Sequence, residues 1–99
     1  MFLINNNYPD RVALICHDGS VITYRELESL VEEFCTYLDE KVLIFILASN
    51  NLESLVCYLS ALELGSVPVL LNEKINNENL DNLIEIYKPK YIFSRNVLV

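Results

Sequence analysis

Residues 41–72 constrain the fold of this chain more than any other part of it, because they predict a strand, a helix and a second strand in direct succession. Lys41 to Ala48 is a near-continuous apolar run of strand length, typical of a strand covered on both faces, and Val67 to Leu71 repeats the pattern. Gly65 stands where a left-handed residue would end the intervening helix. The helix itself is indicated by apolar residues at helical spacing: Leu52, Leu55, Val56, Leu59 and Leu62. This layout predicts a βαβ unit with a parallel pair of strands.

Two short β-prone runs, Val12 to Cys16 and Val21 to Thr23, lie near the N-terminus on either side of Asp18-Gly19. An Asp-Gly pair between such runs favours a tight turn, so we expect a two-stranded hairpin. His17, the single histidine of the chain, falls in this turn. A general base there would need an acidic or nucleophilic partner that the neighbouring sequence does not identify, so we interpret His17 as an exposed turn residue.

The first helix is predicted to begin at Thr23, which has Glu26 at the spacing of a capping box. Ile22 and Leu27 can pack together across this start as a hydrophobic staple. The helix is expected to continue to about Glu40. Its apolar stripe indicates a surface that faces the core and not a cofactor site: Leu27, Leu30, Val31, Phe34, Cys35 and Leu38.

Two further helices have recognisable starts. Asn50, with Glu53 three residues later, is a candidate N-cap for the second helix, and Asn76 is one for the third. Lys88-Pro89 ends the third helix, and Tyr91 to Ser94 is expected to form a last strand. The apolar stripe of the third helix consists of Leu80, Leu83, Ile84 and Tyr87. Residues 1–99 are therefore predicted to form a single α/β unit, an N-terminal β-hairpin followed by alternating helices and a short, mostly parallel sheet.

Composition and charge exclude several classes of function. The chain has 99 residues, enough for one domain, and a formal net charge of −7 with its 7 basic residues scattered, so nucleic-acid binding is not expected. The apolar runs are too short to span a bilayer, and Asn5 to Asn7 interrupt the first of them, so we expect a soluble, cytoplasmic protein without membrane association. The acidic residues are predicted mostly on outer helix faces: Glu26, Glu28, Glu32, Glu33, Glu53, Glu63, Glu78 and Glu85.

No residue of the chain is predicted to be catalytic, cofactor-binding or metal-binding. Cys16, Cys35 and Cys57 lack the close spacing of zinc or redox sites and are interpreted as buried thiols of a protein in a reducing compartment. Gly19 and Gly65, the only glycines, lie far apart, so the chain has no glycine-rich phosphate-binding loop. No nucleophile elbow frames a serine.

Several short motifs follow one another along most of the chain: Pro9-Asp10-Arg11-Val12-Ala13-Leu14-Ile15, Asp18-Gly19, Thr23-Tyr24-Arg25-Glu26-Leu27, Val42 to Ala48 with Asn50, and Leu64 to Asn72. In their order and spacing they resemble the opening of the adenylate-forming enzymes, the AMP-dependent superfamily of acyl-CoA synthetases, peptide-synthetase adenylation domains and luciferases. Members of that superfamily typically have a P-D-x-x-A-L-I strand, a T-Y-x-E-L helix start and a later A-G-A-V-x-V-P-L passage. The turn before Lys41 departs from the pattern, because it is shorter and lacks a G-D-x-V lead-in.

The resemblance implies a function for a larger protein. Its members couple a carboxylate to ATP, with Mg²⁺, to form an acyl-adenylate and pyrophosphate, and commonly pass the acyl group to the thiol of CoA or a carrier protein. Their phosphate loop, nucleotide pocket and mobile C-terminal lysine come after the part matched here, so no catalytic residue transfers to this sequence. We therefore expect the N-terminal scaffold fragment of a larger adenylation domain, inactive on its own, whose partners are the remainder of that domain and, for the parent enzyme, CoA or a carrier protein.

Two other functions are compatible with the sequence. The chain could be a stand-alone interaction module that holds a partner protein at an exposed sheet edge or on its acidic helices. It could also be a flavodoxin-like regulator that uses the loops after the strands, Ser49 to Asn51 and Asn72 to Asn76, as a ligand rim. A scaffold without its neighbours leaves apolar surface uncovered, so self-association is also expected.

Overall fold

The computed structural model describes residues 8, 10–16, 18–49, 51–94 and 97–99. The predicted order of a hairpin followed by alternating helices and strands is confirmed, and one short strand is added at the end. In chain order the elements are β1 (Val12–Ile15), β2 (Val21–Thr23), α1 (Tyr24–Cys35), β3 (Leu43–Ala48), α2 (Leu52–Glu63), β4 (Val67–Asn72), α3 (Asn77–Tyr87), β5 (Tyr91–Ser94) and β6 (Val97–Leu98).

The described strands form two separate sheets. β1 and β2 pair antiparallel as a hairpin, with a register shift between Val12 and Leu14. The larger sheet has the order β4-β3-β5-β6, in which β3 is parallel to both of its neighbours and β6 is antiparallel to β5. The predicted βαβ unit is therefore present as β3, α2 and β4, and the two strands pair along their whole length, from Leu43 with Val67 to Ala48 with Asn72.

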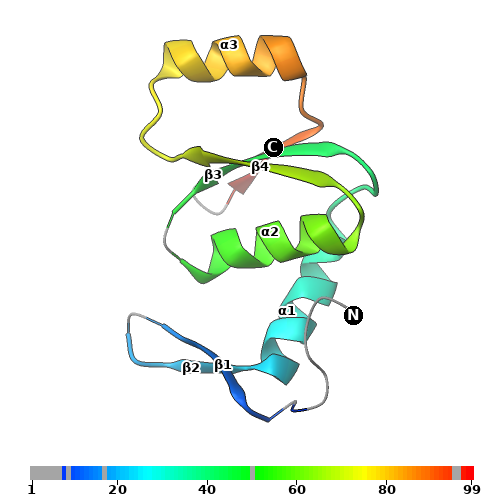
Figure 1. Cartoon of the computed structure of the whole chain (residues 1–99), viewed down its shortest axis with the longest axis vertical. Helices are drawn as coiled ribbons and strands as arrows, with labels where there is room; N and C mark the ends of the chain where they lie inside the picture. The colour runs from blue at the N-terminus through cyan, green and yellow to red at the C-terminus, as the bar shows by residue number, and fades with distance from the viewer. Residues whose placement is uncertain (1–7, 9, 17, 50, 95–96) are drawn as a thin grey trace.

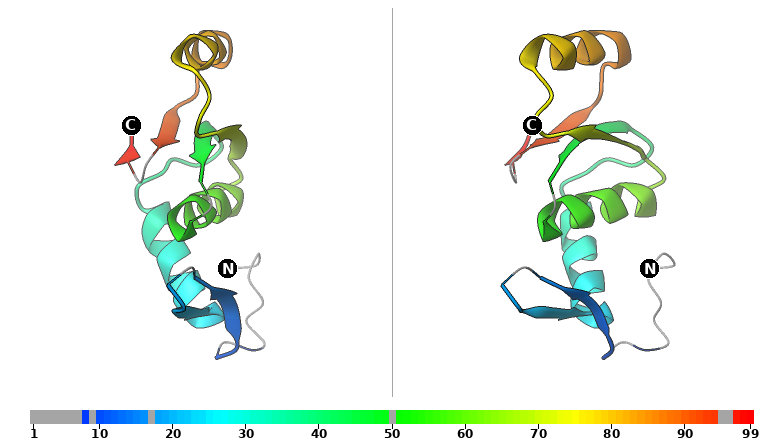
Figure 2. Two further views of the ribbon diagram at one scale, coloured as in Figure 1. Left: turned by 90° about the vertical axis from the view of Figure 1, so that its left-hand side faces the viewer. Right: turned by 60° about the vertical axis from the view of Figure 1, so that its left-hand side comes forward.

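The helices cover opposite faces of the larger sheet. Figure 1 shows α3 above this sheet and α2 below it, with α1 and the hairpin further away on the side of α2. The left view of Figure 2 shows the four strands side by side between α3 and α2, with β6 at one edge and β4 at the other. The hairpin therefore lies several layers away from α3.

The core consists of two clusters that share helix α2. The first lies between α2 and the larger sheet, with Leu38, Ile44, Ile46, Cys57, Ala61 and Phe93 as its buried members. The second joins α1, α2 and the hairpin around Leu27, Val31 and Val56, against which Ala13, Leu14 and Ile22 pack. Because successive side chains of a strand point to opposite faces, Phe45 points away from the first cluster, toward α3.

The start of α1 is the predicted capping box. Thr23 Oγ1 accepts a hydrogen bond from the Glu26 N–H at 3.2 Å, and Glu26 Oε1 accepts one from the Thr23 N–H at 3.1 Å. Ile22 and Leu27, the predicted staple, both belong to the second core cluster. The local sequence therefore determines where this helix begins.

The end of α1 differs from the prediction, because the helix stops at Cys35 and not near Glu40. The N–H groups of Tyr37 and Leu38 donate to the carbonyls of Phe34 and Cys35, three residues earlier. The backbone after Cys35 therefore forms tighter turns than an α-helix. Leu38 is nevertheless buried, as the apolar stripe predicted.

The N-cap of α2 is Asn51 and not the predicted Asn50, which lies outside the described residues. Asn51 Oδ1 accepts from the Ser54 N–H at 2.9 Å, so the helix starts one residue later and Glu53 is not the capping partner. The prediction for α3 is confirmed, since Asn76 Oδ1 accepts from the Asn79 N–H at 2.8 Å.

The turns before β3 and β4 are joined by a buried hydroxyl. Lys41 has a left-handed backbone with φ of 55°, so β3 starts after it and not at it as predicted. Gly65, with φ of +69°, is the left-handed residue expected at the end of α2. Between the two turns, Ser66 Oγ accepts from the Val42 N–H at 3.1 Å and lies 3.3 Å from the Asp39 carbonyl, to which it donates.

Helix α3 is packed less closely than the other helices. None of its residues is buried, and the stripe residues Leu80, Leu83 and Ile84 are half-buried. Tyr87, which was expected to face the core, is 58% exposed, although its ring centroid lies 6.3 Å from that of Phe45. The face of the sheet beneath α3 is therefore only partly covered.

Most of the acidic residues predicted on outer helix faces are exposed: Glu26, Glu32, Glu33, Glu53, Glu78 and Glu85. Glu28 and Glu63 are half-buried, which differs from the expectation. One carboxylate oxygen of Glu63 is buried without a hydrogen-bond partner among the described groups.

Replacing Thr23 with alanine is expected to lower the free energy of unfolding by about 1 kcal/mol, because the Glu26 N–H loses its acceptor. Thr23→Ser keeps a hydroxyl and serves as the matched control, with an expected change within about 0.5 kcal/mol. Urea denaturation followed by circular dichroism measures both variants. Equal losses in the two variants would contradict a capping role for this hydroxyl.

Ser66→Ala is expected to cost about 1–3 kcal/mol of stability, because the half-buried Val42 N–H would be left without an acceptor. Ser29, exposed on α1, provides the control Ser29→Ala, which should change stability by less than about 0.5 kcal/mol. The same denaturation measurement applies, and the role assigned to Ser66 is wrong if the two serine variants are equally stable.

Candidate functional site: the loops after the parallel strands

The loops that follow β3 and β4 are where a sheet of this kind would hold a ligand, because parallel strands end at the same edge. Ala48 pairs with Asn72, so the loop that starts at Ser49 and the loop that starts at Glu73 leave the sheet side by side. The structure thus brings together the two loops that the sequence suggested as the rim of a ligand site. Asn50, in the first of these loops, lies outside the described residues.

The polar groups of the first loop bond mainly to one another. Ser54 Oγ accepts from the Ser49 N–H at 3.2 Å and lies 3.3 Å from Ser49 Oγ. Asn51 Oδ1 accepts from the Ser54 N–H at 2.9 Å. Ser54 is buried, and this set of hydrogen bonds holds the N-terminus of α2 against the end of β3. Ser49 was predicted only as part of a ligand rim and Ser54 was not singled out, because the role of both serines depends on the loop and helix being formed.

The second loop uses its asparagines in the same way. Asn72 Oδ1 accepts from the Lys74 N–H at 2.9 Å, and the Asn72 carbonyl accepts from the Ile75 N–H at 3.0 Å. Asn76 Oδ1 caps α3 through the Asn79 N–H. The side-chain oxygens of this loop therefore stabilise a turn and a helix start and do not converge on a ligand.

A groove of about 960 Å³ opens between the hairpin and the N-terminal half of α2. Its lining is mostly apolar and comes from Leu14, Ile15 and Ile22 of the hairpin region, Leu52, Leu55 and Tyr58 of α2, and Leu70 of β4. Asp18 and Glu53 are its carboxylates. Asp18 Oδ1 accepts from the Ser20 N–H at 3.0 Å and from the Ser20 hydroxyl at 2.7 Å, and these hydrogen bonds lower the pKa of the Asp18 carboxyl.

This groove does not fit ATP. A triphosphate needs cationic side chains, a bound cation or converging backbone amides, whereas no lysine or arginine is found among the lining residues. The two carboxylates on the lining would repel the phosphates. We therefore assign no step of nucleotide chemistry to the residues that line this groove.

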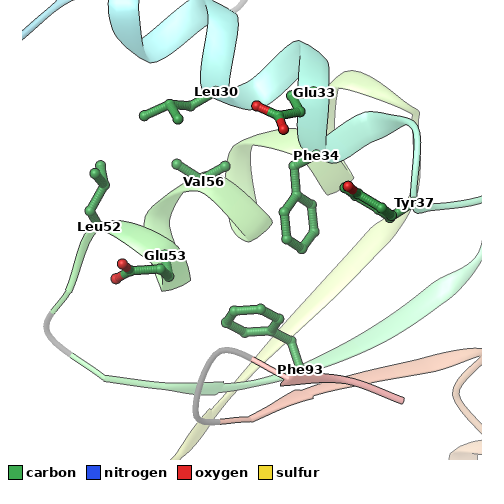
Figure 3. Close-up of a pocket in the computed structure, with 8 residues that line it drawn as sticks. All are labelled: Leu30, Glu33, Phe34, Tyr37, Leu52, Glu53, Val56 and Phe93. Carbon is green, nitrogen blue, oxygen red and sulfur yellow. The ribbon is translucent and has the colours of Figure 1, made fainter.

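A smaller pocket of about 240 Å³ lies between α1, α2 and β5. Figure 3 shows the rings of Phe34 and Phe93 facing each other at one side of it, and their centroids are 5.7 Å apart in an edge-to-face arrangement. Glu33 and Glu53 come from the two helices that border the pocket. The volume is below the roughly 300–1,000 Å³ of typical small-molecule sites, and the lining contains no Ser, Thr, Cys, Lys or His side chain.

Of the described thiols, the two nearest the core do not meet the requirements of a reactive site. Cys57 is fully buried, and this burial raises the pKa of its thiol from 9.0 to about 12. Burial also raises the pKa of the Cys35 thiol, which donates to the Ser60 carbonyl at 3.8 Å. Because the thiolate is the reactive form, neither thiol is a nucleophile near neutral pH. Cys16 is half-buried, and His17 lies outside the described residues.

Within the described ranges, no three or more His, Cys, Asp and Glu side chains come together in a group that could hold a metal ion. The helices in this part of the chain are also too short or too polar to cross a membrane.

The sequence matches a known family over almost its whole length. The profile of the AMP-binding enzyme family aligns with residues 4–98. The 2-succinylbenzoate–CoA ligase of Haemophilus influenzae is 24% identical over 97 residues, which cover 93% of this chain and 22% of that enzyme.

Solved structures share the fold. Apo MatB from Rhodopseudomonas palustris matches 85% of this chain and 18% of its own, with 25% identity and a TM-score of 0.80. The N-terminal subdomain of Klebsiella oxytoca NpsA in complex with 3-hydroxybenzoyl-AMSN matches 97% of this chain and 26% of its own, with 26% identity and a TM-score of 0.82. The artificially fused adenylation-PCP di-domain NpsA-ThdA from the same organism matches 97% and 19%, with 26% identity and a TM-score of 0.83.

The hairpin, the helices and the mostly parallel sheet thus form the fold found in the N-terminal subdomains of adenylation domains. The chain belongs to the AMP-binding enzyme family and corresponds to the N-terminal part of an adenylate-forming enzyme, so the resemblance seen in the sequence is confirmed. It spans 22% of the length of the Haemophilus ligase.

Reaction with a thiol reagent at pH 8 is expected to separate the cysteines. The half-buried Cys16 should react in the folded protein, whereas Cys57 should react only as fast as the protein unfolds, because its thiol is buried and neutral. The neutral buried thiol stabilises the fold below about pH 9, and this contribution is lost as the pH rises toward about 12. Cys16→Ser should remove the fast phase, whereas Cys57→Ala should remove one of the two slowly reacting thiols and leave Cys35. Rapid modification of Cys57 in the folded protein would contradict the burial described here.

Proposed function

We propose that this chain is the N-terminal scaffold of an ATP-dependent ligase that activates a carboxylic acid. The proposed reaction of the whole enzyme joins a carboxylate and ATP into an acyl-adenylate with release of pyrophosphate, and then passes the acyl group to the thiol of CoA or of a carrier protein. The observation that carries this proposal is the family match through residues 4–98. ATP and Mg²⁺ belong to the whole enzyme, and no residue of this chain is assigned to either.

The names of the similar proteins support the two halves of the reaction. The Haemophilus relative is a CoA ligase, which supports an acid as substrate and CoA as acceptor. The Klebsiella subdomain is described in complex with 3-hydroxybenzoyl-AMSN, and a second structure is an adenylation domain fused to a PCP, which support an acyl-adenylate site and a carrier protein as the alternative acceptor. The acid itself is not specified by any of these similarities.

The described residues support a scaffold role without catalysis. The polar side chains at the ends of β3 and β4 are used for capping and turns, and the groove beside α2 contains carboxylates and no cation. A chain with these properties holds α2 and the parallel strands in place as a base for residues supplied by the rest of the enzyme. On its own it should neither bind ATP productively nor activate an acid.

The cytoplasm is the proposed location, because the free thiols of the half-buried Cys35 and the buried Cys57 fit a reducing compartment. Nucleic acid is not a proposed partner, since the chain has a net charge of −7.

The isolated chain is expected to show no ATP–pyrophosphate exchange above the buffer background with 2-succinylbenzoate, 3-hydroxybenzoate or anthranilate. The Haemophilus ligase provides the positive control with 2-succinylbenzoate. Exchange catalysed by the 99-residue chain itself would contradict a scaffold role. A chimera in which this chain replaces the matched part of the Haemophilus ligase is expected to regain exchange, and a correctly folded but inactive chimera would count equally against the proposal.

A further inference from the structure

Helix α2 is apolar on more sides than its described neighbours cover. Apart from Glu53 in its first turn, none of its residues is exposed, and its buried apolar residues pack against α1 or the larger sheet. A third side carries Leu52, Leu55 and Tyr58, which recur every three residues and form a half-buried ridge. A helix that is apolar all round is typical of the interior of a larger domain.

This ridge is one wall of the groove of about 960 Å³, and exposed side chains from distant parts of the chain extend the apolar lining. Ile15 of β1 is 75% exposed and Leu70 of β4 is 55% exposed. Leu70 pairs with Ile46, a member of the first core cluster, so it lies on the α2 side of the sheet. Val67, on the same strand, is 59% exposed but lies on the opposite face and does not line the groove. The hairpin, α2 and β4 thus all turn apolar side chains toward one groove.

The charge of the lining selects against the small molecules of the proposed reaction. A carboxylic acid substrate, ATP and CoA are all anionic, whereas Asp18 and Glu53 are the charged side chains of the lining. A second copy of the chain, with a net charge of −7, would be repelled in the same way. The occupant of the groove should therefore combine an apolar surface with a positively charged group.

The backbone of β4 selects against an added strand as the occupant. Pro68 has no N–H, and the Asn72 carbonyl already accepts from the Ile75 N–H of the same chain at 3.0 Å. An occupant that packs through its side chains fits the groove better. A ridge of side chains three residues apart, as on α2, is a surface on which another helix packs.

We propose, resting on the function proposed above, that an amphipathic helix from the remainder of the same enzyme packs in this groove. Its apolar face contacts Leu55, Tyr58 and Leu70, and a lysine or arginine side chain of the helix faces Asp18 and Glu53. The lengths of the similar proteins favour this source over a separate partner. This chain matches 26% of the Klebsiella N-terminal subdomain, so the rest of that single subdomain is other polypeptide that packs around the same core.

Cys16 lines the groove and reports whether the groove is filled. Its half-buried thiol should react rapidly with a thiol reagent in the isolated chain. In the chimera with the Haemophilus ligase described above, the helix should slow this reaction roughly tenfold or more, because the groove then opens only in a minor population. Mass spectrometry of the labelled peptide measures both rates. A rate in the isolated chain that falls with rising chain concentration would indicate a second copy in the groove and overturn the proposal.

Leu70→Lys tests the contact directly, and Val67→Lys on the same strand is the matched control. Both side chains are exposed in the isolated chain, so neither variant should change its thermal unfolding followed by circular dichroism. In the chimera, Leu70→Lys should lower the unfolding midpoint and restore rapid labelling of Cys16, because it places a charge among apolar side chains and repels the cation of the helix. Val67→Lys should leave both unchanged. Equal effects of the two variants in the chimera overturn the proposal.

ATP–pyrophosphate exchange by the chimera separates this inference from the proposed function. A folded chimera without exchange counts against the proposed function, while the labelling of Cys16 still decides whether the groove is filled. An active chimera in which Cys16 reacts as fast as in the isolated chain leaves the proposed function standing and overturns the helix in the groove.

Discussion

Burial of α2 on two sides is the interaction on which the rest of the structure depends. Cys57 and Ala61 face the larger sheet, whereas Val56 faces α1 in the second core cluster. Ser60 is fully buried at the contact with α1, where its hydroxyl bonds to the Val56 carbonyl at 2.7 Å and lies 3.3 Å from the Val31 carbonyl. Small side chains at these positions let the helix approach its neighbours closely, so a bulkier residue would separate both clusters at once.

The same arrangement occupies the polar groups at the ends of β3 and β4. The polar groups that a ligand could use at the strand ends are already bonded to the backbone of α2 and α3, where they fix the starts of these helices. The Cys57 thiol is neutral because it is buried, and partial burial raises the pKa of the Cys35 thiol as well. The chain belongs to the AMP-binding enzyme family, and under the function proposed above it serves as a base for chemistry supplied by the rest of the enzyme.

The sequence predicted the features that depend on neighbouring residues. The βαβ unit was predicted from two apolar runs on either side of an amphipathic helix. The Thr23 and Asn76 caps were predicted because each side chain lies only a few residues from the N–H group whose hydrogen bond it accepts. Features that depend on packing were missed. The apolar stripe through Leu38 predicted a longer α1, but the helix ends at Cys35. Leu38 is buried all the same, because a tight turn can place an apolar residue in the core as well as a helix can.

The sequence also could not predict which of two adjacent asparagines caps α2, or the very short strand β6. Asn50 and Asn51 have the same side chain, so only the observed helix start identifies Asn51 as the cap. β6 has two residues and forms only because β5 offers it an edge. The exposure of Tyr87 could not be predicted, since periodicity shows which face of a helix is apolar but not how much of it another element covers. The expectation that the chain has no catalytic residue rests on missing motifs and stays a prediction.

The order of the strands has a consequence for how the chain acquires its shape during synthesis. β3 lies between β4 and β5, so its second edge stays open until residues roughly 20 positions beyond β4 have left the ribosome. In that interval the βαβ unit can already be formed, while the second edge of β3 remains without its partner strand. The loosely packed α3 acts as the tether that carries β5 across to this edge. A nascent chain of this kind is most vulnerable to wrong strand pairing just before its last strands are complete.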